Sequence, residues 1–65
     1  MKKRLSKNES KVWEYLLGYL KDNGFMPTYA RAGIDLDWSA QYVHSMVVNM
    51  EKKQWLKIKN GNIKL

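Results

Sequence analysis

The chain has 65 residues and a mass of 7.7 kDa, which allows one small hydrophobic core and no second domain. It contains no cysteine and a single histidine, which argues against disulfides and the usual zinc ligand sets. Gly-rich phosphate loops and Ser-His-Asp sets are missing, and no apolar run is long enough to span a bilayer. We therefore expect a cytoplasmic protein that is not an enzyme, needs no cofactor or metal and does not enter a membrane.

The formal net charge of +6 is concentrated at the two ends of the chain. Residues 1–11 carry five basic side chains and one acidic one, and residues 52–65 carry five lysines and no acid. The middle segment, residues 12–51, holds two basic and five acidic side chains. Two basic ends are typical of a protein that grips a polyanion. A merely solvated lysine surface is the alternative interpretation.

A capping box predicts where the first helix begins. Ser6 is followed three residues later by Glu9, so each side chain can bond the backbone N–H of the other residue. Apolar residues then recur at spacings of three and four, which indicates an amphipathic helix. Asn23-Gly24 ends it, because glycine readily adopts the left-handed conformation at a helix C-terminus. We expect a helix over 6–23, preceded by a flexible basic arm over 1–5.

Thr28 and Ser39 are the expected caps of two further helices, over 28–36 and 39–53. Gly33 lies inside the first of them, where glycine costs about 1 kcal/mol relative to alanine. This cost indicates that another backbone passes close to Gly33. The buried stripe of the helix over 39–53 is expected to consist of Val43, Met46, Val47 and Met50.

Asn60-Gly61 between two alternating runs is the strongest short-range signal for a β-hairpin. A two-residue loop pairs Lys57 with Lys64 and Ile58 with Ile63. Lysines directly opposite each other cost stability, which indicates that their face meets negative charge outside the protein; protection of a sheet edge is the alternative. We expect a hairpin over 55–65 with Leu56, Ile58, Ile63 and Leu65 on its buried face.

The expected fold is mainly α with a small β-hairpin, and three helices followed by a two-stranded wing are the order of a winged helix-turn-helix. Specific residues support this interpretation: Leu5-Ser6, Val12, Leu16, Asn23-Gly24-Phe25-Met26-Pro27-Thr28, Leu36, Ser39, Met50-Glu51-Lys52-Lys53 and Trp55-Leu56-Lys57-Ile58. In this order and spacing they resemble the N-terminal DNA-binding domain of LexA-type repressors, a winged-helix family, over nearly the whole chain. The resemblance implies a single winged helix domain over 1–65.

The chain departs from the pattern of that family at several positions. Ala32 stands where the family prefers a larger aliphatic residue, Asp37 replaces the usual turn glycine, and Gln54 replaces the glycine after the third helix. The turn before the third helix is one residue shorter, and we do not expect the catalytic domain through which those repressors dimerise and cleave themselves. The fold is therefore expected to carry over better than the regulation or the operator sequence.

The resemblance implies that the helix over 39–53 lies in the major groove of DNA. Gln41 is the best candidate for direct readout, because its amide can bond adenine N6 and N7 together. Lysines of the wing would meet a flanking phosphate backbone or minor groove. The implied contacts are Ser39, Ala40, Gln41, Tyr42, His44, Ser45, Val48, Asn49 and Lys52 on the helix, Lys57, Lys59, Asn60, Asn62 and Lys64 on the wing, and Lys2, Lys3 and Arg4 in the arm.

These features predict a sequence-specific regulator of transcription that binds double-stranded DNA, repressor-like, associated with the nucleoid, and either a monomer or a weak homodimer on DNA. A protein partner is the alternative, since winged helices also serve in antirepressors and inhibitors. The helix over 39–53 has no arginine, and exposed Tyr42 and Val48 would fit a protein surface. His44 is expected to be an ordinary surface residue, because an isolated histidine lacks partners.

Overall fold

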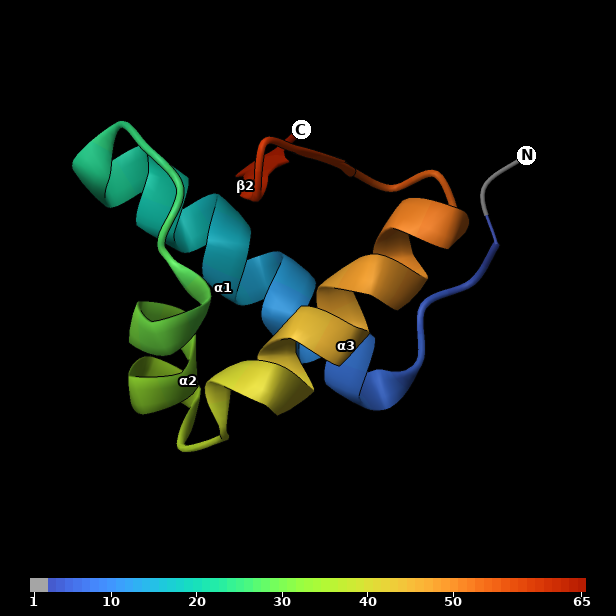
Figure 1. The fold of residues 1–65 in the computed structure, drawn as a ribbon, viewed down its shortest axis with the longest axis horizontal. Coiled ribbons are helices and arrows are strands. Elements are labelled where there is room, and N and C mark those ends of the chain that lie inside the picture. Colours follow the sequence, from blue (N-terminus) through green and yellow to red (C-terminus); the bar gives the residue numbers. More distant parts are fainter. Residues whose placement is uncertain (1–2) are drawn as a thin grey trace.

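Three helices pack around one core in a computed structural model that describes residues 3–65, and a two-stranded antiparallel hairpin ends the chain (Figure 1). Helix α3 crosses in front of α1 in this view, with α2 beside them. The predicted order is confirmed, and the helices differ from the predicted ranges only by their cap residues. The elements are α1 (Lys7–Asn23), α2 (Tyr29–Leu36), α3 (Ala40–Lys52), β1 (Lys57–Lys59) and β2 (Asn62–Lys64).

Each helix begins where a hydroxyl side chain accepts a backbone N–H, as predicted. In the capping box, Ser6 Oγ accepts from the Glu9 N–H at 3.2 Å, and Glu9 Oε1 accepts from the Ser6 N–H at 2.7 Å. Thr28 and Ser39 cap α2 and α3 in the same way, each at 3.1 Å. Gly24 ends α1 with a φ of 78°. These local signals fix the helix boundaries because each one satisfies otherwise unpaired backbone groups.

The core is formed by side chains from all three helices and the hairpin. Met46, which we expected in the buried stripe of α3, is only partly buried. Leu65 was expected on the buried face of the hairpin but is 55% exposed, because strand pairing ends at Lys64 and Leu65 follows the last paired residue. The buried hydrophobic residues are Val12, Leu16, Ala32, Val43, Val47, Met50, Leu56 and Ile63.

The turn between α2 and α3 lies directly against Gly33. A Cβ atom at this position would lie 2.6 Å from the carbonyl oxygen of Trp38 and 3.1 Å from the amide nitrogen of Ala40. The Trp38 N–H also donates to the Gly33 carbonyl at 2.8 Å. The predicted close passage of another backbone is confirmed, and it sets the position of α3 relative to α2.

Two non-glycine residues adopt the left-handed conformation where helices end. Asp37 has a φ of 60° at the end of α2, and Gln54 has a φ of 68° after α3. The left-handed conformation costs an ordinary residue about 1–2 kcal/mol, and aspartate tolerates it better than most. Both turns therefore form without a glycine.

The segment ahead of α1 is fastened to the end of α3, which differs from the expected flexible arm. Trp55 Nε1 donates to the Lys3 carbonyl at 2.6 Å, and Lys53 Nζ donates to the Arg4 carbonyl at 3.1 Å. The next residue, Leu5, packs against the core. The expectation of a free arm is therefore wrong for residues 3–5, because backbone carbonyls of this segment are hydrogen-bonded to side chains that follow α3.

Substitution of the two interior helix glycines should have opposite effects. Gly33→Ala should lower the free energy of unfolding by about 1–3 kcal/mol, because the added methyl group clashes with backbone. Gly18→Ala should raise it by up to about 1 kcal/mol, because a Cβ at Gly18 meets nothing within 4 Å. Urea unfolding followed by circular dichroism measures both values. A destabilised Gly18→Ala protein, or an unchanged Gly33→Ala protein, would contradict this difference.

The buried Glu9 carboxylate should make stability depend on pH. Burial alone would raise the pKa of Glu9, but hydrogen bonds from Lys53 and Ser6 outweigh it and hold the pKa below its usual value. A lowered pKa in the folded state stabilises the protein above the unfolded-state pKa of about 4.3, and this contribution is lost as the pH falls through the folded-state pKa.

Glu9→Gln should therefore lower the free energy of unfolding by about 1–3 kcal/mol at pH 7. The difference from the unmodified protein should shrink as the pH falls through the folded-state pKa of Glu9, because its carboxylate is then protonated. Urea unfolding over a series of pH values measures it. Equal stability of the two proteins at pH 7 would show that the ion pair contributes nothing.

Candidate nucleic-acid interface

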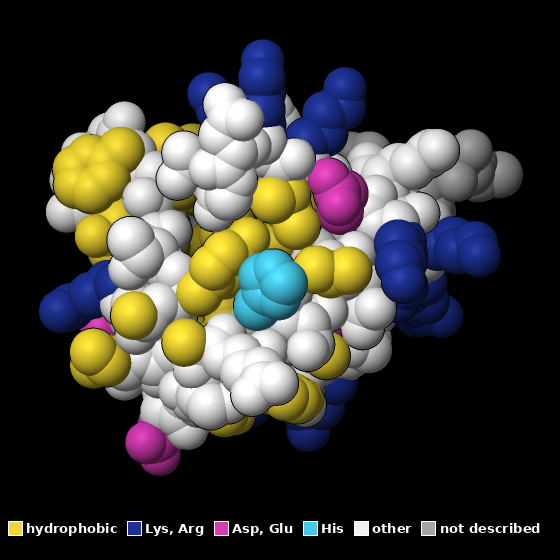
Figure 2. Space-filling view, viewed as in Figure 1, with side chains coloured by type: hydrophobic (Ala, Val, Ile, Leu, Met, Phe, Trp, Pro, Cys, Tyr) yellow, Lys and Arg dark blue, Asp and Glu magenta, His cyan; other side chains and the backbone are white. Residues whose placement is uncertain are grey.

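One side of α3 is turned to solvent, opposite the core residues Val43, Val47 and Met50 (Figure 2). His44 lies near the middle of this face in the space-filling view, surrounded by hydrophobic and uncharged polar atoms. Val48 is half-buried beside it. The predicted contact residues that α3 and its cap leave exposed are Ser39, Ala40, Gln41, Tyr42, His44, Ser45, Asn49 and Lys52.

Tyr42 and His44 are exposed but held in place by residues outside α3. The Tyr42 ring packs edge-on against Trp38 with centroids 5.0 Å apart, and Asn8 Nδ2 donates to its hydroxyl at 2.8 Å. The Tyr42 hydroxyl can still donate its own proton to a phosphate oxygen. The His44 ring packs edge-on against Tyr29 with centroids 4.8 Å apart, and His44 is an exposed residue of the helix surface, as expected.

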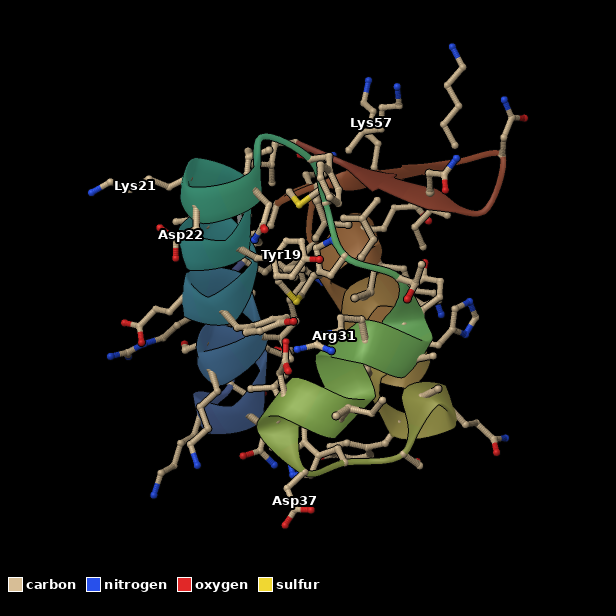
Figure 3. The ribbon with its side chains drawn as sticks, turned by 90° about the vertical axis from the view of Figure 1, so that its left-hand side faces the viewer. Tyr19, Lys21, Asp22, Arg31, Asp37 and Lys57 are labelled. Atoms are coloured by element: carbon tan, nitrogen blue, oxygen red, sulfur yellow. The ribbon has the colours of Figure 1, made fainter. Side chains whose placement is uncertain are left out.

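The hairpin has the predicted register: Lys57 pairs with Lys64, Ile58 with Ile63, and Lys59 with Asn62. Asn60 and Gly61 form the turn with φ values of 53° and 78°, as a type I′ turn requires. Paired residues share a face of the sheet, so the buried Ile63 leaves both lysines of the first pair exposed on the other face. In Figure 3, Lys57 points away from the three helices.

Glu51 connects the hairpin to α3, a role that no sequence pattern pointed to. Its Oε2 accepts from the backbone N–H of Ile58 at 2.8 Å, which fixes the start of β1 against the last turn of α3. Burial raises the pKa of Tyr29, and the Glu51 carboxylate raises it further, so the Tyr29 hydroxyl stays neutral at pH 7. Because Glu51 of α3 binds the backbone of the first strand, the exposed side of α3 and the hairpin lysines are held in one arrangement.

The two basic ends of the chain lie side by side in the folded protein. The carbonyls of Lys3 and Arg4 are bound by side chains that follow α3, and the side chains of both residues are exposed. Lys2 lies outside the described residues. Figure 2 shows lysine and arginine side chains gathered along the upper and right borders of the α3 face. The positive charge therefore borders this face, one acidic side chain lies on it below the upper lysines, and the atoms around His44 are uncharged.

Comparisons with protein-family models, with curated proteins and with solved structures found no match. Among residues 3–65, no three His, Asp or Glu side chains are grouped so that they could hold a metal ion. No helix in that range combines the length and the apolar character needed to cross a membrane. The proposal of a function therefore depends on the geometry of α3 and the hairpin.

Proposed function

We propose that the protein is a winged helix-turn-helix that binds double-stranded DNA and regulates transcription in a repressor-like manner at the nucleoid. One observation carries the proposal. The outward side of α3 presents the hydrogen-bonding side chains of Gln41, Ser45 and Asn49, and exposed lysines border it. A helix of 13 residues is about 20 Å long, and the major groove of about 12 Å admits an α-helix.

The three polar residues of α3 have the spacing that base readout needs. Gln41, Ser45 and Asn49 follow one another every four residues, which places them about 6 Å apart along the outward side of the helix. The amides of Gln41 and Asn49 suit adenine, and the Ser45 hydroxyl suits several bases or a phosphate. Gln41 lies in the first turn of α3, where recognition helices contact base edges.

The hairpin lysines supply contacts that do not depend on sequence. Lys57 and Lys64 lie on one exposed face, and Lys59 lies beside the turn. Phosphate contacts position a protein on the duplex, whereas contacts to base edges specify the sequence. Asn60 and Asn62, at the tip of the hairpin, are placed to reach a flanking backbone or minor groove.

A protein partner is the second candidate function, as for an antirepressor. The observation that favours it is the uncharged surface around His44, which hydrophobic and uncharged polar atoms surround. Helix α3 also contains no arginine. Core regions of protein interfaces are depleted in charge in the same way. This candidate predicts no affinity for DNA even at low salt.

Binding of a random-sequence duplex should weaken steeply with salt. If about five lysines neutralise phosphates, the logarithm of the binding constant should fall with the logarithm of salt concentration with a slope of about −4 to −5. Fluorescence anisotropy of a labelled duplex across a salt series measures this slope. Absence of binding at low salt would refute DNA binding and leave the protein partner as the better candidate.

The wing and the recognition helix should make separable contributions to binding. Replacing Lys57 and Lys64 with glutamine should weaken binding to all sequences alike and reduce the magnitude of the salt slope by about 2. Lys21→Gln is a control for net charge, because Lys21 lies on α1 and points away from the hairpin (Figure 3). The control removes one positive charge and the double variant removes two, so a loss half as large from the control would show that net charge alone governs binding.

Gln41→Ala should relax the preference for the best sequence without changing the salt slope. Loss of one bidentate contact should cost about 1–3 kcal/mol of discrimination at one base pair. Selection of bound sequences from a random duplex pool, performed with both proteins, identifies that base pair. Identical selected motifs for the two proteins would exclude Gln41 from base readout.

A further inference from the structure

A second surface of the molecule lies on α1, on the side that faces away from the core. Exposed positions on this side recur every three or four residues and include Lys11, Glu14, Gly18 and Lys21. Leu17, at the edge of this stripe, keeps 41% of its surface exposed. We call these residues, together with Asp22, the α1 stripe. No ion pair involving its charged residues is present within residues 3–65.

Gly18 in the α1 stripe has no explanation within its own chain. Glycine weakens the interior of a helix, and Gly33 is explained by the backbone that lies 2.6 Å from its would-be Cβ. At Gly18 a Cβ would meet no atom within 4 Å, and its φ is not left-handed. A missing side chain on an exposed helix lets another backbone approach closely.

The surface beside Gly18 is a groove between α1 and α2 with a fixed far wall. The Tyr15 hydroxyl donates to Asp35 Oδ2 at 2.5 Å, and Arg31 pairs with Asp35 at 3.1 Å. Tyr19 and Arg31 lie between the two helices in Figure 3, Asp22 also lines the groove, and Lys21 points outward. The hollow at Gly18 is therefore bordered by side chains that are already oriented.

The charged residues of the α1 stripe form two pairs, one on each flank of the stripe when the helix is viewed down its axis. At about 100° per residue, Glu14 and Lys21 point within about 20° of each other on one flank, and Lys11 and Asp22 do so on the other flank. In each pair the two residues lie on opposite sides of Gly18 along the helix axis. A second identical helix that crosses antiparallel at Gly18 would thus place Glu14 near Lys21 of the other copy, and Lys11 near Asp22.

We propose that the α1 stripe binds the α1 stripe of a second copy of this chain, with the two helices antiparallel and crossing at Gly18. A parallel two-fold pair would instead place Glu14 near Lys11 of the other copy and Lys21 near Asp22. The antiparallel arrangement is favoured because it brings the partly positive N-terminus of each helix beside the partly negative C-terminus of the other, whereas a parallel one brings like ends together. Leu17 packs against Leu17 of the second copy at the edge of the contact. A two-fold contact of this kind uses the same patch on both subunits.

The proposed dimer is expected to be weak. A standard interface buries about 800 Å² per partner, about a sixth of the 4706 Å² that this chain exposes, and one helix face supplies less than that. The net charge of +6 on each copy also opposes association, although about 0.15 M salt screens charges beyond about 8 Å.

The α1 stripe and the exposed side of α3 lie on opposite sides of the molecule. In Figure 3 the outward side chains of α1 point to the left, and the α3 face that Figure 2 views from the front is on the right. Self-association therefore leaves α3 free. The two α3 faces of a dimer therefore point away from each other. What this arrangement means for DNA binding rests on the function proposed above.

Sedimentation equilibrium between about 10 µM and 1 mM protein, in about 0.15 M salt, tests the pairing. The unmodified chain should form dimers within this range. Gly18→Gln should weaken dimerisation at least tenfold, and its melting temperature should not fall, because glutamine favours a helix and meets no atom of its own chain. A chain that stays monomeric to 1 mM, or a Gly18→Gln protein that dimerises like the unmodified chain, overturns the proposal.

A charge exchange identifies the orientation. Glu14→Lys and Lys21→Glu should each weaken dimerisation several-fold, although they change the net charge in opposite directions. The double variant should restore it, because the opposite charges meet again across the two-fold axis. Failure of the double variant to recover overturns the antiparallel arrangement. Random-duplex affinity of the double variant, measured at low protein concentration, should equal that of the unmodified chain, so failure of this proposal is distinguishable from failure of DNA binding.

Discussion

One buried carboxylate joins the parts of this small fold. Glu9, with 3% of its surface exposed, accepts from the Ser6 N–H at the start of α1 and pairs with Lys53 Nζ at 2.5 Å. The same ammonium group donates to the Arg4 carbonyl. A charge buried in this way is tolerated only when its hydrogen bonds are satisfied. The start of α1, the end of α3 and the N-terminal segment therefore depend on one another.

The chain uses similar means to connect α3 to the hairpin. Gln54 turns the backbone in the left-handed conformation, and the Trp55 N–H donates to the Met50 carbonyl at 3.0 Å. The Trp55 ring then packs edge-on against Trp13 at 5.2 Å, and Glu51 binds the first strand. The hairpin lysines are consequently presented at a fixed position relative to α3. Such preorganisation lowers the entropy cost of binding.

Features of the fold that depend on near neighbours could be predicted from the sequence. The helix starts could be predicted from Ser6, Thr28 and Ser39, because the hydroxyl group of each accepts a hydrogen bond from the backbone N–H three residues later. The hairpin turn could be predicted from Asn60-Gly61, because few other residue types adopt the positive φ that both positions require. The outward residues of α3 followed from helical spacing, since the opposite side had to be the core.

Contacts between distant residues could not be predicted. These contacts join helices that come together only because the core packs. They are the pairs Asn8 with Tyr42, Tyr29 with His44, and Lys53 with Glu9. No periodicity marks such pairs. Residues 3–5 were wrongly expected to belong to a flexible arm because their anchors are backbone carbonyls, which every residue has. Leu65 follows the alternation of the strand but lies beyond its last pair.

The most direct measurement of the central claim is an NMR titration of the ¹⁵N-labelled protein with a short duplex. DNA binding through α3 and the hairpin predicts amide shift changes along the exposed side of residues 40–52 and in residues 57–64, with little change at Leu17, Gly18 and Lys21. Unchanged spectra with excess duplex at low salt, or changes confined to the outward side of α1, would contradict it.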